Sequence, residues 1–132
     1  MSGQAKPEGT ITRGGARDLT DYQYHAMQIT SAEVIDYADT SAGNSVLGIL
    51  QNADCDAAGR AAEVATEGTS LLRVDGNSVN IAPGDKLGSN SSYHGVKVTA
   101  DKAKYFCIAL EPSTADNDLI EVKMTGESYL AA

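Results

Sequence analysis

Two matching strand–loop–strand segments, about sixty residues apart, constrain the fold of this chain more than any other feature. In the first, the apolar residues 46–51 are followed by a polar loop and a returning segment at 62–65. In the second, residues 106–111 are followed by an acidic loop and a returning segment at 120–123. Each returning segment has Glu-Val at its centre. Short alternating segments of this kind predict half-buried β-hairpins.

The rest of the chain adds further short extended segments separated by turn residues. They lie at residues 24–29, 34–37, 69–74, 79–81, 86–87 and 96–99. Ala82-Pro83-Gly84-Asp85 is a strong turn signal, because Pro presets φ and Gly tolerates positive φ. No window holds a helical apolar stripe, so we expect less than about a tenth of the residues to be helical. The sequence predicts an all-β fold: a small β-barrel, a β-tulip-like domain or a sandwich.

Composition narrows the function. A chain of 132 residues is one domain by size, and its single Phe and absent Trp predict a core of Val, Ile, Leu and Ala. The formal charge of −8 argues against nucleic acid as the main partner. We expect no membrane span and no secretory signal, and therefore synthesis in a cytoplasm.

Residues 1–21 differ from the remainder, residues 22–132, which we expect to form a single β-rich domain. Up to residue 17 the chain carries three cations and one acid, a net charge of +2 that leaves −10 for the rest. The segment is either a floppy terminus or an arm that becomes ordered only against a partner. In the second case the expected contact residues are Lys6, Ile11, Arg13, Arg17 and Leu19: the apolar pair would bury, and the cations would meet acidic groups.

No catalytic or metal-binding constellation is evident, and we predict no enzyme, cofactor or metal site. His25 and His94 are far apart in the sequence, and neither has a Cys, His or carboxylate at the spacing of metal ligands. We expect His25 to be a strand residue that is hydrogen-bonded or half-exposed, and His94 to be a solvated loop residue. Asp54-Cys55-Asp56 and Asp116-Asn117-Asp118 offer paired oxygen ligands, as calcium loops do, but both fall where a hairpin must turn.

The two cysteines are too few for a disulfide scaffold. Cys107 lies in an apolar strand and is expected to be a small buried hydrophobe. Cys55 lies in a polar loop and is expected to be an accessible thiol. Sequence alone leaves a bond between them open.

A series of blocks follows in unbroken order between about Tyr22 and Met124. They are residues 24–28, 48–53, 67–70, 81–89, 95–98 and 108–111. Together they resemble the capsid decoration (cement, or head-stabilising) proteins of tailed bacteriophages. Residues 1–21 match no block, and the polar loop at residues 89–94 departs from the family pattern.

The resemblance implies a non-enzymatic structural virion protein on the outer surface of an expanded phage capsid. Its implied partners are the major capsid protein, whose neighbouring subunits it would stabilise, and itself, as a homotrimer. Neither nucleic acid nor membrane is implied. The alternative is a small β-barrel module that binds a saccharide or another small ligand. Seven aromatic residues scattered along the chain, with no Trp, speak against that alternative.

Overall fold

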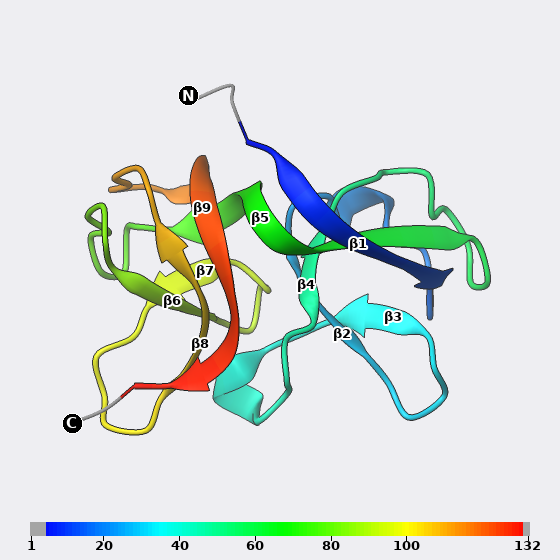
Figure 1. The fold of residues 1–132 in the computed structure, drawn as a ribbon, viewed down its shortest axis with the longest axis horizontal. Coiled ribbons are helices and arrows are strands. Elements are labelled where there is room, and N and C mark those ends of the chain that lie inside the picture. The colour runs from blue at the N-terminus through cyan, green and yellow to red at the C-terminus, as the bar shows by residue number, and fades with distance from the viewer. Residues whose placement is uncertain (1–4, 131–132) are drawn as a thin grey trace.

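A computed structural model describes residues 5–130 of the chain, and its regular structure is almost entirely β (Figure 1). The only helical elements within these residues are two 3-10 turns, η1 (Thr20–Tyr22) and η2 (Thr40–Ala42). The all-β prediction is therefore confirmed. The strands are β1 (Pro7–Gly14), β2 (Ala26–Ile29), β3 (Ile35–Tyr37), β4 (Gly48–Leu50), β5 (Ala61–Asp75), β6 (Lys86–Ser89), β7 (Gly95–Lys97), β8 (Lys104–Ala109) and β9 (Asp116–Tyr129).

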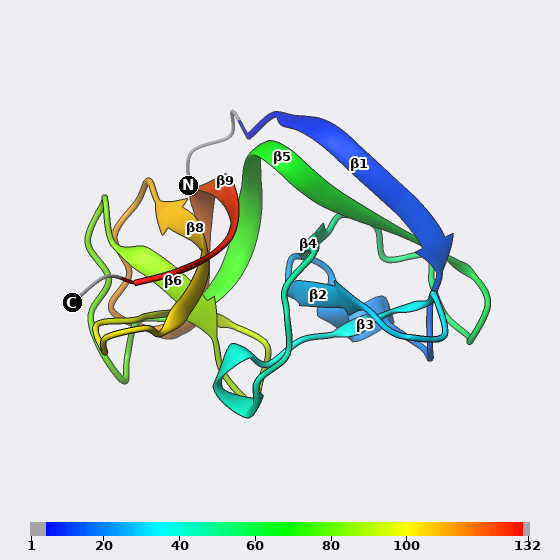
Figure 2. The ribbon, with the colours of Figure 1, turned by 60° about the horizontal axis from the view of Figure 1, so that its bottom comes forward.

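Strand β5 runs through both halves of the molecule and joins them (Figures 1 and 2). Its first half pairs with β1 and β4, and its second half pairs with β9 and β7. At the change of direction Gly68 has φ +81°, and a Cβ there would lie 2.5 Å from the carbonyl oxygen of Lys6. The sequence predicts two strands here, at 62–67 and 69–74. The structure has one bent strand, because glycine adopts this φ without a break in the chain.

The first half is an antiparallel sheet in the order β3-β2-β4-β5-β1. It covers a small core that also takes residues from the loops. The fully buried members of that core are Leu19, Met27, Ile35, Leu50, Cys55, Ala62 and Val64.

In the second half, the strand pairings run in a closed circuit, β5-β7-β6-β8-β9 and back to β5. Every pairing is antiparallel except that of β5 with β7, a single parallel pair between Val74 and Gly95. The circuit surrounds the larger core, which includes Leu72, Leu87, Phe106 and Val122. Small and branched side chains dominate both cores, as the composition predicts.

Both predicted hairpins form. In the first, Ile49 lies opposite Ala65, and in the second Ala109 lies opposite Val122. Two strand boundaries differ from the prediction. Residues 79–81 contribute only one bridge, from Ile81 to Ser113, because Asp75 caps a tight turn just before them. Strand β9 continues to Tyr129, through polar residues that show no apolar alternation.

The N-terminal segment also differs from the expectation. Residues 7–14 form β1 and pair with β5 of the same chain, from Pro7 opposite Gly68 to Gly14 opposite Ala61. The expectation that the whole segment needs a partner for order is therefore corrected for these residues. The low apolar content of this segment does not prevent the pairing, because backbone hydrogen bonds hold β1 against β5. Residues 1–4 lie outside the described part of the chain.

Candidate functional site

Strand β1 lies at the outer edge of the first sheet (Figure 2). It pairs with β5 alone, so within residues 5–130 its other edge has no neighbouring strand. Every residue of β1 is exposed or half-buried, and none belongs to either core. A strand with one free edge and no core side chains can pair with another chain through its backbone.

The structure separates the five expected contact residues into two groups. Lys6, Ile11 and Arg13 lie on or beside β1, and Ile11 is half-buried while the two cations are exposed. The backbone nitrogen of Lys6 donates to the hydroxyl oxygen of Thr69 at 2.7 Å, which ties the start of the strand to β5.

Arg17 and Leu19 are engaged within the chain itself. The guanidinium of Arg17 donates two hydrogen bonds of 2.9 Å to Asp36, and this pairing raises the pKa of Arg17. The same guanidinium lies 4.6 Å from the ring centre of Tyr37. Leu19 is fully buried in the smaller core. The expectation that Leu19 buries against a partner is therefore wrong, since its own fold already covers it.

Three tyrosines gather beside Arg17. The rings of Tyr37 and Tyr93 are stacked, with centres 4.0 Å apart, and Tyr22 lies 5.1 Å from Tyr37 and 5.9 Å from Tyr93. The sequence suggests that the aromatic residues are scattered, but three of the tyrosines form a cluster in the fold. Their scatter cannot be used as an argument against a small-ligand module.

The two histidines, expected to be far apart, lie with ring centres 4.9 Å from each other. His94 is buried rather than solvated, and its Nδ1 is 2.9 Å from a carboxylate oxygen of Asp116. Both histidines and Asp116 line a cavity of about 540 Å³ at the surface. The backbone nitrogen of Ala26 donates a hydrogen bond to the carbonyl oxygen of Tyr93 and so brings the two histidines together. Sequence reasoning missed this proximity because the two segments are far apart in the chain.

The two acidic segments differ. Residues 54–56 lie in the loop between β4 and β5, whereas residues 116–118 begin strand β9, so the expectation of a turn is wrong for the second segment. Asp56 forms an ion pair with Arg60, and Asp118 accepts a hydrogen bond from Ser113. Within residues 5–130 no group of three or more His, Cys, Asp or Glu side chains is placed to hold a metal.

Both cysteines are buried and unbonded, in different cores. The Cys55 thiol lies 3.4 Å from the carbonyl oxygens of Arg17 and Arg60. The expectation of an accessible thiol at Cys55 is wrong, because the N-terminal segment folds over it. Burial raises the pKa of the Cys107 thiol well above its usual value.

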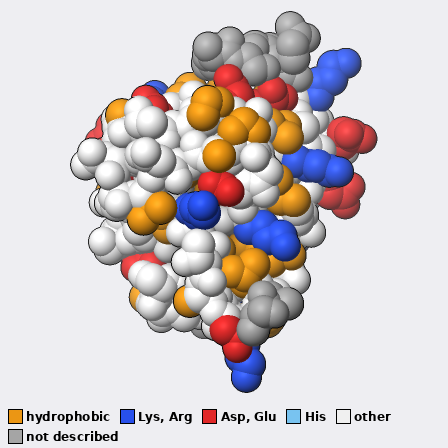
Figure 3. Space-filling view, turned by 90° about the vertical axis from the view of Figure 1, so that its left-hand side faces the viewer, with side chains coloured by type: hydrophobic (Ala, Val, Ile, Leu, Met, Phe, Trp, Pro, Cys, Tyr) orange, Lys and Arg blue, Asp and Glu red, His pale blue; other side chains and the backbone are white. Residues whose placement is uncertain are grey.

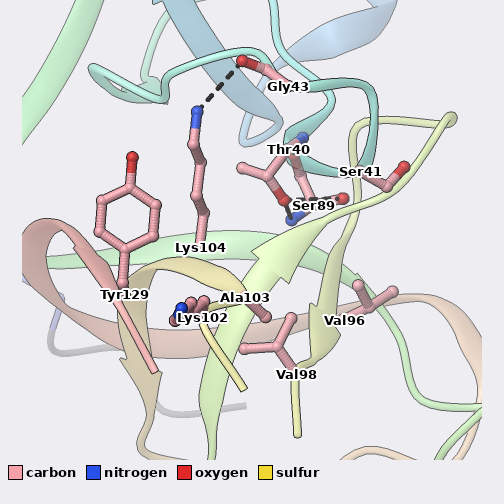
Figure 4. A pocket seen from close by; sticks show the side chains of 10 residues that line it. All are labelled: Thr40, Ser41, Gly43, Ser89, Val96, Val98, Lys102, Ala103, Lys104 and Tyr129. Atoms are coloured by element: carbon pink, nitrogen blue, oxygen red, sulfur yellow. Dashed lines mark hydrogen bonds between the residues drawn. The ribbon is translucent and has the colours of Figure 1, made fainter. Parts of the chain in front are cut away.

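A hollow of about 380 Å³ lies between η2, β7, β8 and the end of β9 (Figure 4). Lys104 extends across it and donates from Nζ to the Gly43 carbonyl oxygen at 3.1 Å. Tyr129, which is 59% exposed, stands at its rim. On the face drawn in Figure 3, hydrophobic side chains lie among Lys and Arg side chains.

A free strand edge and exposed apolar side chains are features through which a domain can bind another protein. Comparison with known families matches residues 17–124 to the phage cement proteins, and the chain belongs to that family. Its family indicates a structural role on the phage capsid. The match begins after β1 and ends within β9. No curated protein matches the chain, and no helix within residues 5–130 has the length and apolar character to cross a membrane.

Proposed function

We propose that this protein binds the outer surface of an expanded phage capsid and stabilises contacts between neighbouring major capsid subunits. The family match is the observation that supports the capsid role. Strand β1, with its free edge, is the contact element in this proposal. We place the protein on the virion after synthesis in the host cytoplasm.

The geometry of β1 supports this assignment. A capsid segment that adds to the free edge of β1 would extend the first sheet by one strand, with backbone hydrogen bonds supplying affinity. Lys6, Arg13 and the half-buried Ile11 lie along that edge and would supply specificity. The main domain carries the acidic excess, which favours solubility at high concentration before assembly.

We also propose that the protein is a homotrimer when bound to the capsid. Four large apolar side chains are at least 40% exposed in the single chain: Ile29, Val79, Leu110 and Tyr129. Association would cover part of this surface. The number three comes from the resemblance to decoration proteins. Sedimentation of the free protein, together with its copy number and arrangement on heads, tests this part of the proposal.

The capsid role is tested by sedimenting the protein with expanded and unexpanded heads of the phage that encodes it. We expect saturable binding to expanded heads alone, and a higher melting temperature of the heads that carry it. Binding selects the assembled lattice because that surface does not exist on free subunits. Equal binding to both kinds of head, or to neither, would contradict the proposal.

A truncation tests the role of β1. Removal of residues 1–14 takes away the strand but leaves both cores complete. We expect the truncated chain to remain folded and to lose binding to expanded heads. If it binds as tightly as the full chain, β1 is not the contact element, even if the capsid role is correct.

A further inference from the structure

The cavity that holds both histidines has a volume typical of sites for small molecules, about 540 Å³. It lies where the segment before β2 meets the loop between β6 and β7 and the start of β9. No residue of β1 lines it, so the proposed capsid contact does not account for its chemistry.

Most of the lining is polar, and several of its groups are free to bind. The hydroxyls of Ser91 and Ser92 and the side-chain amide of Asn117 make no hydrogen bond within residues 5–130. Asp116 uses Oδ1 for His94 and for the backbone nitrogen of Asn117, which leaves Oδ2 without a partner among these residues. The cavity therefore offers donors and acceptors side by side. This mixture suits a ligand with several hydroxyls, because each hydroxyl both donates and accepts.

Aromatic rings form another part of the lining. Tyr22 and Tyr93 both line the cavity, with ring centres 5.9 Å apart in an edge-to-face arrangement. Tyr93 is also stacked on Tyr37, which fixes the orientation of its ring. The face of an aromatic ring carries partial negative charge and attracts weakly positive C–H groups. A sugar ring presents such groups beside its hydroxyls.

The backbone at the cavity is held in a conformation that tyrosine rarely adopts. Tyr93, in the lining, has φ +66°, and Tyr24, next to His25, has φ +65°. In both tyrosines the backbone nitrogen and the carbonyl oxygen are engaged in hydrogen bonds of 2.7–3.1 Å. Strained positions that the surrounding structure holds in place cluster at ligand-binding sites. The cavity is therefore preformed, and a ligand would not have to order it.

The charges around the cavity favour a neutral ligand. Burial lowers the pKa of His25 despite its contacts with two backbone carbonyls, and nearby His94 and Arg73 lower it further. The His25 ring is therefore uncharged at pH 7. The charged side chains nearby are of both signs: Asp116 in the lining, and Arg73 and Asp75 on β5. An anion would meet the carboxylates, and a cation would meet Arg73.

We propose that this cavity binds one neutral pyranose unit of a saccharide. The C–H groups of the sugar would lie against Tyr22 and Tyr93, and its hydroxyls would bond to Asp116, Asn117 and the two serines of the loop. This activity goes beyond the capsid role and does not depend on it. On a capsid, many copies of a weak site would act together by multivalency.

The first test is nuclear magnetic resonance of the free, nitrogen-15-labelled chain, titrated separately with glucose, galactose, mannose and N-acetylglucosamine. We expect at least one of the four sugars to shift the backbone amides of residues 91–94 and 116–117 in a saturable way. Glycerol, which has hydroxyls but no pyranose ring, is the control and should give no saturable shift. No saturable shift with any of the four sugars, or shifts confined to other residues, would overturn the proposal.

The second test measures the affinity of a double variant, Ser92→Ala with Asn117→Gly, for the sugar that binds best. Both polar side chains are removed, and glycine keeps the positive φ of residue 117, which is +65°. We expect a roughly tenfold loss of affinity. The matched control, Ser31→Ala with Asn80→Gly, removes the same groups from exposed positions that do not line the cavity, and should bind as the parent does. Equal affinity in the parent and the cavity variant would refute the site.

Discussion

The backbone nitrogen of Leu19 donates a hydrogen bond of 2.7 Å to the carbonyl oxygen of Cys55, and both side chains are fully buried in the smaller core. This contact fastens the end of the N-terminal segment to the loop between β4 and β5. The N-terminal segment therefore has two parts with different roles. Residues 7–14 form a peripheral strand, whereas Leu19 is part of the core on which the first sheet rests.

Substitution of Leu19 should therefore destabilise the protein more than removal of β1 does. Leu19→Ala leaves a cavity and is expected to lower the free energy of unfolding by about 2–5 kcal/mol. Removal of residues 1–14 costs less, since no core side chain is lost. Urea unfolding of the two variants decides the order. A larger loss from the truncation would show that β1 is part of the cooperative core.

Stability should fall as the pH drops below neutrality, and His25 should be one cause. Burial lowers the pKa of His25 in the folded chain below the usual 6.5, so the unfolded chain binds the proton more tightly. The contribution is complete above about pH 6.5 and is lost as the pH falls toward the folded pKa. Melting temperatures between pH 7.5 and 5 should depend less on pH in His25→Asn.

Two carboxylates, Asp18 and Asp75, affect stability in a separate pH range. Hydrogen bonds lower the pKa values of Asp18 and Asp75 below the usual 3.8. The stability that these two groups contribute is therefore lost only as the pH falls below the range in which His25 titrates, toward their lowered pKa values. An unchanged slope in His25→Asn above pH 5 would assign the loss to other groups.

Neither thiol should react in the folded protein. Cys55 and Cys107 are fully buried, and burial favours the protonated form of Cys107, which is not the nucleophile. We expect an aromatic disulfide reagent to release no colour from the native chain within minutes and two equivalents after denaturation. Rapid reaction of one thiol in the native state would show that the N-terminal segment opens above Cys55.

Charge on β1 should matter for binding rather than for folding. Reversal of both strand cations, Lys6→Glu with Arg13→Glu, should weaken binding to expanded heads and make it less dependent on salt. The matched control is Lys102→Glu with Lys123→Glu, which makes the same change in net charge at two exposed cations outside β1. If the control weakens binding as much as the β1 variant, the effect reflects net charge and not a contact at β1.

Local pattern was sufficient to predict much of this fold. Alternation located both hairpins, and the turn at residues 82–85 forms with Gly84 at φ +94°. Local pattern could not show that β5 is a single strand. Gly68 serves as readily within a bent strand as between two strands, and the choice depends on β1 lying against it.

The same limit applies to the sites. The burial of Leu19 and Cys55 and the approach of His25 to His94 all depend on loops that meet only in the folded chain. Residues 69 positions apart carry no shared local signal. Conversely, the cations of the N-terminal segment were read as one group, but Arg17 is bound to Asp36 while Lys6 and Arg13 remain exposed.

Amide hydrogen exchange, compared between the free protein and the protein on expanded heads, tests the capsid contact most directly. Backbone pairing at the free edge of β1 predicts new protection of residues 7–14 on the heads, with the amides of β5 protected in both states. Protection that appears elsewhere, with β1 exchanging as it does in the free protein, would contradict the account.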